Sequence, residues 1–135
     1  MAGPEETGIV QVRSRFPVAE TVDRLRAVLD AKGITLFALI DHSGEAARVG
    51  MAMPETKLLV FGSPKAGTPV MLAAPTSALD LPLKILVREE AGPGGRVLVA
   101  YNAAAWLAAR HGIPGELVPV LAGVEGLVAQ VAAAS

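Results

Sequence analysis

The chain has 135 residues, of which 52% are hydrophobic and 19% are charged, so it can bury a sizeable core and is not of the disordered class. This length is typical of one domain. The formal net charge is −1, with acidic and basic residues interspersed, which argues against a nucleic-acid partner held by phosphate contacts. The absence of cysteine excludes disulfides, thiolate metal sites and cysteine nucleophiles.

The first half of the chain predicts a strand, a long helix and a second strand. Residues 8–14 alternate apolar and polar side chains, as a half-buried strand does. Pro17 suits the first turn of a helix, and Gly33 suits its C-cap. Residues 34–42 are apolar on both faces, so we expect this strand to be central in a sheet. On this hypothesis the span Ile34–Ile40 is covered on both faces, and its large side chains are buried, namely Leu36, Phe37 and Leu39.

The second half adds shorter elements. Ser43 can cap a short helix that runs to Arg48. Residues 56–61 predict a strand, 62–68 a loop, and 69–74 a short helix with Thr68 as its N-cap and Pro69 at its first position.

Two further strands, 83–90 and 96–101, flank a turn-rich joint at 91–95 and predict a hairpin. Asn102 is expected to cap a helix through Arg110.

The C-terminal segment 117–134 is almost wholly apolar and about long enough to cross a bilayer. Glu125 and Gln130 interrupt it, and its large side chains recur at three- and four-residue spacing, which predicts an amphipathic helix docked on the core. The initial residues MAGPEETG contain no apolar run, so no signal peptide is predicted. We therefore expect a cytoplasmic protein without a membrane partner. The stripe of this helix comprises Leu117, Val120, Leu121, Val124, Leu127, Val128 and Val131.

The predicted order of elements is β-α-β-α-β-α-β-β-α-α. A hairpin combined with mixed crossovers favours an α+β fold, with an antiparallel or mixed sheet and helices on one face. We expect one compact domain across residues 1–135, with its core at about 8–132.

Several segments in register resemble a family of small prokaryotic proteins, the domain of unknown function 302 family. They are ETVDRLRAVLDAKG, FGSPKAGTPVM, ALDLPLKILVREE, VLVAYN and WLAARHG, in that order. Where the family pattern usually has Asn, this chain has Ser63. The resemblance implies an α+β domain similar in topology to one repeat of the TATA-binding protein, often a homodimer, and it implies no reaction.

The segment 62–68 is the first candidate site. A glycine-rich turn before a helix exposes backbone N–H groups that attract anions, and its side chains would add a charge and hydroxyl donors. The spacing differs from that of a phosphate-binding P-loop, and the alternative is a tight turn that only caps the next helix. The candidate binding residues are Gly62, Ser63, Lys65, Gly67 and Thr68.

Two acidic residues accompany His42 as candidates for acid–base chemistry. A histidine at a strand end could act as a general base if Asp41 or Asp80 oriented its ring, although an exposed strand end needs no such role. Asp80 stands in a strongly apolar run, so it must be paired, hydrogen-bonded or functional. Its alternative role is a turn bond to nearby backbone.

His111 and Tyr101 complete the set of candidate binding residues. Tyr101, at a strand end, could reach the same region with its hydroxyl. His111 ends a helix, where a basic side chain also stabilises the helix dipole. Two histidines without cysteine are too few to predict a metal site, even if Asp41, Glu45 or Asp80 added oxygen ligands. The sequence leaves open whether a cofactor binds.

Three functional hypotheses remain open. The first is a non-enzymatic, homodimeric binding module for a small polar or anionic ligand, in a pocket lined by segment 62–68, Asp80 and the histidines. The mean hydropathy of +0.47 supports the dimer, because surplus apolar surface commonly marks an interface. The second is a small enzyme with His42 as base and Asp80 or Asp41 as orienter. The third is a purely structural or interaction protein.

Overall fold

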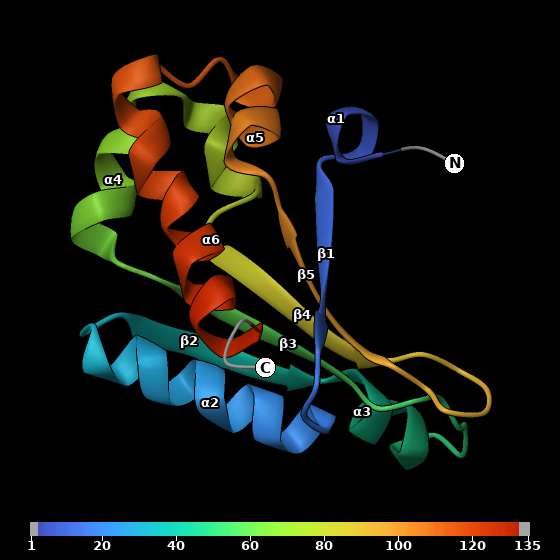
Figure 1. Cartoon of the computed structure of the whole chain (residues 1–135). Coiled ribbons are helices and arrows are strands. Elements are labelled where there is room, and N and C mark those ends of the chain that lie inside the picture. Colours follow the sequence, from blue (N-terminus) through green and yellow to red (C-terminus); the bar gives the residue numbers. More distant parts are fainter. Residues whose placement is uncertain (1–2, 133–135) are drawn as a thin grey trace.

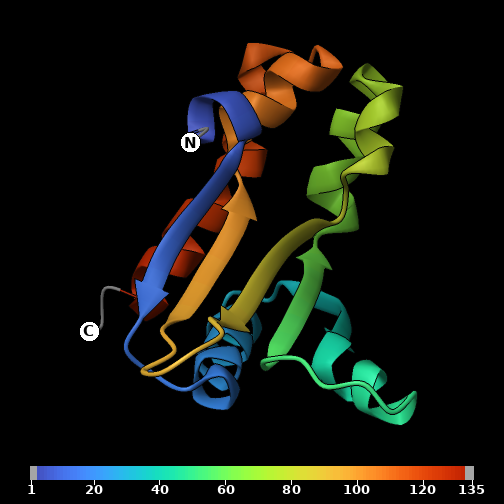
Figure 2. The same ribbon diagram turned by 90° about the vertical axis from the view of Figure 1, so that its right-hand side faces the viewer.

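The protein is built on one antiparallel five-stranded sheet with the strand order β1-β5-β4-β3-β2. The computed structural model describes residues 3–132. Helices α2 and α6 cover the same face of this sheet (Figure 1), and Figure 2 shows the other face, with both helices behind the strands. The predicted α+β class with helices on one face is therefore confirmed. The strands are β1 (Ile9–Ser14), β2 (Thr35–Asp41), β3 (Thr56–Gly62), β4 (Leu83–Glu89) and β5 (Val97–Asn102).

Helix α2 (Val18–Ala31) buries one face on the sheet, and its C-cap is Lys32, one residue before the predicted Gly33. Pro17 is its N-cap rather than its first helical residue. Gly33 adopts a φ of +68°, and its N–H and that of Ile34 donate to Asp30 and Leu29 oxygens. These two bonds satisfy carbonyls that the helix end would otherwise leave open.

Helix α6 (Val118–Ala132) packs against α2 and the sheet. The predicted stripe is confirmed where it meets the core, because Leu121, Val124, Leu127, Val128 and Val131 are buried. The segment Gly115–Ala132, which includes the short 3₁₀ turn η2 (Gly115–Leu117), is long and apolar enough to cross a membrane by length and composition, and 33% of it is buried inside the fold.

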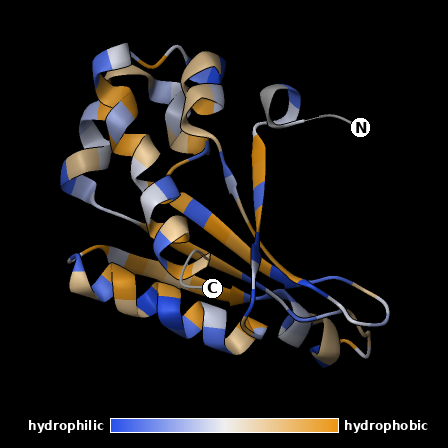
Figure 3. Ribbon diagram, in the orientation of Figure 1, coloured by the Kyte–Doolittle hydropathy of each residue, from blue (hydrophilic) through white to orange (hydrophobic). Residues whose placement is uncertain are grey.

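Strand β2 lies at the edge of the sheet, so the prediction of a central strand is wrong. It pairs only with β3, and a bulge at Phe37 shifts the register between Leu36 and Ala38. Phe37, Leu39 and Ile40 are 48%, 37% and 38% exposed. A two-sided apolar pattern is typical of a central strand, yet here it belongs to an edge that the described chain leaves uncovered. In Figure 3, β2 is coloured as hydrophobic along much of its length.

Three helix starts differ from the sequence-based expectations. Helix α3 (His42–Arg48) is capped by Asp41 rather than Ser43. Helix α4 (Pro64–Ala73) begins at the N-cap Ser63, so most of the expected loop 62–68 is helical. Helix α5 (Ala104–His111) has Ala103 at its N-cap, because Asn102 is still the last residue of β5.

The remaining elements are short. The helix α1 (Pro4–Thr7) was not expected, and the 3₁₀ turn η1 (Pro75–Leu79) joins α4 to β4. The predicted β4–β5 hairpin is confirmed, since β4 pairs antiparallel with β5. Away from the sheet, α4, α5 and α6 pack on one another around a second apolar cluster, which comprises Val70, Ala74, Ala104, Leu107, Ile113 and Leu121.

Candidate functional site

A cavity of about 440 Å³ lies between the start of β2, the end of β3, α4 and α6. This size is within the usual range of small-molecule sites. Its walls are mainly apolar, with contributions from Phe37, Met71, Leu83 and Leu127. Four of the predicted site residues line it, namely Gly62, Ser63, Gly67 and Thr68, whereas Lys65 does not.

The amino-terminal end of α4 forms one wall of this cavity, but its backbone donors are largely used within the helix. Ser63 accepts from the N–H of Ala66 through both its hydroxyl and its carbonyl, and its carbonyl also accepts from the N–H of Gly67 at 2.8 Å. Pro64 has no N–H to offer. The sequence left segment 62–68 open between an anion-binding turn and a turn that caps the next helix. The structure makes most of this segment the capped start of α4.

Polar groups reach the cavity at its edge. Lys32, just after α2, contributes to the lining, and so do the hydroxyl-bearing residues Ser63 and Thr68. Among residues 3–132, Lys32 forms no ion pair. A cation beside an apolar chamber suits a ligand with an apolar body and one acidic group. Sequence reasoning missed Lys32 and Phe37, because they come from a helix end and a strand that gave no motif.

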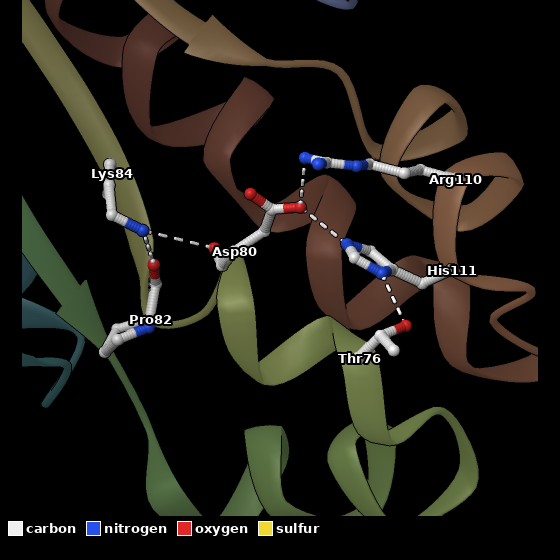
Figure 4. Close-up of polar contacts among 6 residues, drawn as sticks. All are labelled: Thr76, Asp80, Pro82, Lys84, Arg110 and His111. Carbon is white, nitrogen blue, oxygen red and sulfur yellow. Dashed lines mark hydrogen bonds and ion pairs between the residues drawn. The ribbon is translucent and has the colours of Figure 1, made fainter.

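A polar cluster gathers around Asp80 on the η1–α5 side of the molecule (Figure 4). The Oδ2 atom of Asp80 lies 2.5 Å from Nε2 of His111 and 3.0 Å from NH1 of Arg110. Lys84 donates from Nζ to the Asp80 and Pro82 carbonyl oxygens at 3.3 and 3.0 Å. Asp80 is therefore paired, as its apolar sequence context required.

The ring of His111 has both nitrogens engaged. Nδ1 lies 2.8 Å from the Thr76 hydroxyl, while Nε2 faces Asp80, and the side chain is only 3% exposed. A general base needs a nitrogen that can reach the substrate proton. Here the imidazole instead joins α5 to η1. Asp80 does not line the cavity, although its neighbours Leu81 and Pro82 do.

His42 lies at the other end of the sheet from Asp80. Asp41 pairs with Lys57 near the start of β3, whereas Leu83, which follows the Asp80 segment, pairs with Phe61 near its end. The structure therefore does not bring His42 to Asp80. Asp41 does adjoin His42, but its carboxylate accepts from the Gly44 N–H at 3.0 Å and from the Ser43 hydroxyl at 2.8 Å. These bonds hold the pKa of Asp41 below its usual range.

Tyr101 is half-buried near the end of β5 and packs against the main core. Burial, with a smaller contribution from the Glu125 carboxylate, raises the pKa of the Tyr101 phenol. It is not part of the cavity lining. Within the described residues, no three His, Asp or Glu side chains gather as a metal site would require.

A family model described as "Domain of unknown function DUF302" matches residues 10–131. The chain is 39% identical over 113 residues to a protein named fluoride-specific ion channel FluC 1 of Brucella suis, covering 84% of this chain and 44% of that protein. FluC 1 of Brucella abortus matches at the same identity, over 41% of its length. The chain thus spans less than half of these relatives.

A crystal structure of an uncharacterized DUF302 protein from Bacillus stearothermophilus shares the fold. Its TM-score is 0.75 at 17% sequence identity, over 93% of this chain and 96% of the other. The likeness to one repeat of the TATA-binding protein stays a prediction.

Proposed function

This chain belongs to the DUF302 family, a family of unknown function, and from its own geometry we propose that it is a non-enzymatic binding module for a small amphipathic carboxylate. The observation that carries the proposal is the apolar cavity of about 440 Å³ with Lys32 at its edge. Apolar walls remove the ligand body from water, at about 25 cal/mol per Å² of apolar surface buried. The ammonium of Lys32 then orients the acidic group.

This ligand class refines the small polar or anionic ligand expected from the sequence. A fully polar ligand would lose its hydration against walls such as Phe61, Leu121 and Val124 without gaining partners. An aliphatic or aromatic body avoids that cost. Ser63 and Thr68 supply further polar contacts at the α4 wall.

Acid–base catalysis is the weaker alternative. His42 and Asp80 lie at opposite ends of β3, and His111 has both ring nitrogens bonded within the protein. A homodimeric interaction domain is the second candidate function. It is favoured by exposed large side chains on β2 and on the chain after α3, where Val49 and Met51 are 74% and 67% exposed.

The Brucella relatives place a domain of this type within a longer protein named as a fluoride channel. A ligand-binding module suits such a setting, because a bound small molecule can bias the state of an attached partner. Our proposal includes a cytoplasmic location, in keeping with a helix α6 that packs on the protein core.

The test is a titration with decanoate and decanol, followed by calorimetry and by thermal shift. Both probes should bind and raise the melting temperature, because a ligand that binds only the folded state stabilises it. Decanoate should bind more tightly, and Lys32→Met should remove this difference. Failure of both probes to bind the wild type would overturn the proposal.

A cavity-filling variant locates the binding. Gly126 lines the cavity, and a Cβ added there meets nothing within 4 Å, so Gly126→Leu should fill the space and weaken decanol binding at least about tenfold. The matched control is Gly115→Leu, at a glycine that is equally open but outside the lining. Equal affinity in the two variants would place the ligand elsewhere.

A further inference from the structure

Strand β2 forms an uncovered edge of the sheet beside the cavity. Six of the seven residues of β2 are exposed, and only Leu36 is half-buried. An edge strand presents unpaired backbone N–H and C=O groups that can pair with another strand. Proteins usually protect such an edge with lysine, proline or a covering element. Strand β2, with the sequence TLFALID, contains no lysine or proline.

We propose that two copies of this chain pair their β2 strands antiparallel, and that the end of the partner's β2 closes the mouth of the cavity at Phe37. This inference rests on the proposed binding function and names the partner that completes the same site. The commitment to a second copy follows from the character of β2. A strand that pairs antiparallel with itself about a twofold axis satisfies its own edge groups, as an isologous interface requires.

The distribution of charge along β2 favours the antiparallel direction. Residues 35–40 carry no charge, so no like charges oppose one another along the pair. The basic Lys32 precedes the strand, and the acidic Asp41 ends it. Antiparallel pairing places these opposite charges at the same end of the interface, whereas parallel pairing would bring like charges together. An ammonium has three donors, so Lys32 can serve both a ligand carboxylate and the partner's Asp41.

The centre of β2 is Ala38, which has three strand residues on either side. A pair centred there sets Thr35 opposite the partner's Asp41. The chain after the partner's Asp41 then lies beside Ile34, which lines the cavity. This arrangement brings the partner's His42 to the cavity mouth. Within a single chain, His42 lies at the far end of the sheet from the cavity.

Phe37 connects the edge and the cavity. It forms the bulge of β2, it is 48% exposed, and it lines the cavity. Its ring lies next to Gly62, where an added Cβ would come within 3.8 Å of Cε2 of Phe37. Burying the exposed half of this ring against a partner strand would remove apolar surface from water and shut the chamber at the same step.

The first experiment measures self-association by light scattering at micromolar concentrations. We expect twice the monomer mass of 13.8 kDa for the wild type. Ala38→Lys should weaken the dimer at least about a hundredfold, because it sets two ammonium groups across the twofold axis. The matched control, Ala105→Lys, puts the same charge on an exposed position of α5 and should leave the dimer intact. A monomeric wild type, or a dimer unaffected by Ala38→Lys, would overturn the proposal.

Cross-linking tests the register, in a chain that contains no cysteine of its own. Directly opposed residues in antiparallel strands have Cβ atoms about 4.5–5.5 Å apart, which is near the span of a disulfide. Ala38→Cys should therefore form a covalent dimer under mild oxidation far faster than Ala105→Cys. Equal rates would contradict a pair centred on Ala38.

The affinity of the monomeric Ala38→Lys variant for ligand tests whether the partner's β2 closes the cavity mouth. Ala38 does not line the cavity, so loss of decanol binding in Ala38→Lys reports loss of the partner. We expect a drop of about tenfold, and His42→Ala should lower the affinity of the dimer without dissociating it. Unchanged affinity in both variants would show that the partner's β2 does not close the cavity mouth. The proposed binding function would still stand. If the wild-type dimer binds no ligand, both the proposed function and the closure of the cavity by the partner are wrong. The pairing of the β2 strands would still be judged by light scattering and cross-linking.

Discussion

His111 and Asp80, 31 positions apart in the chain, share a contact of 2.5 Å that joins α5 to the end of η1. Arg110 bonds the same carboxylate oxygen, and Thr76 bonds the other ring nitrogen of His111. These contacts hold the C-terminal end of α5 against the segment that leads into β4. Leu81 and Pro82 of that segment line the cavity. The cluster therefore supports one wall of the proposed binding site from outside.

We predict that Asp80→Asn destabilises the fold by about 1–3 kcal/mol, because a hydrogen-bonded charged partner of a buried ring is lost. The measurement is urea unfolding at neutral pH. Asp23→Asn is the matched control, on an exposed position of α2, and it should change stability by less than about 0.5 kcal/mol.

If Asp80 only supports the wall, the folded Asp80→Asn variant keeps its affinity for decanol. A variant of wild-type stability that had lost ligand binding would instead place Asp80 in the site.

The apolar stripes of α2 and α6 were predictable from the sequence, because a helix that buries one face has apolar residues at regular three- and four-residue spacing. No sequence pattern predicts the contact between Asp80 and His111, since it arises only when α5 packs beside η1. Sequence proximity therefore favoured His42, which lies near Asp41 in the chain and far from Asp80 in the fold.

The edge position of β2 could not be predicted from its composition. Apolar residues on both faces ordinarily report a strand with neighbours on either side. Residues 3–132 supply no second neighbour to β2. The apolar pattern therefore cannot separate a central strand from an edge that a partner covers.

The start of α4 was ambiguous for a local reason. Ser63-Pro64 and Thr68-Pro69 both match an N-cap followed by proline. The earlier pair caps the helix, and Pro69 lies inside it.

Two glycines should respond oppositely to alanine. Gly126 is inside α6 with open space around an added Cβ, so Gly126→Ala should stabilise the protein by about 0.5–1 kcal/mol through the entropy of the unfolded chain. Gly8 has a φ of +75°, and its added Cβ would overlap the Trp106 ring, so Gly8→Ala should destabilise by at least about 1–2 kcal/mol. Thermal unfolding of both variants in parallel checks this. A stabilised Gly8→Ala would contradict the packing of the Trp106 ring against Gly8.

The β4–β5 hairpin should carry an acid-sensitive ion pair. Arg96 donates to Glu90 from Nε at 2.6 Å and from NH2 at 3.1 Å, and this hydrogen bonding holds the pKa of Glu90 below its ordinary value of 4.5. Because the folded pKa is lowered, the stabilisation is present above pH 4.5 and is lost as the pH falls through the folded value. Carboxyl NMR titration should show the Glu90 pKa rising toward 4.5 in Arg96→Gln and staying unchanged in Arg24→Gln. An identical titration in wild type and Arg96→Gln would rule out the pair in solution.

Tyr101 offers the converse test at alkaline pH, and it is the only tyrosine in the chain, so its absorbance can be assigned without mutation. Burial first, and then Glu125, raise the pKa of its phenol above 10.0. Because the folded pKa is raised, its contribution to stability is complete below pH 10 and is lost as the pH rises through the folded value. Ultraviolet titration of the native protein should therefore show a midpoint above that of the urea-unfolded chain. Glu125→Gln should lower the native midpoint only partly, since burial is the larger cause, and Glu116→Gln serves as a control on an exposed residue of η2. Coincident midpoints for the native and unfolded protein would show that the phenol is not held between β5 and α6.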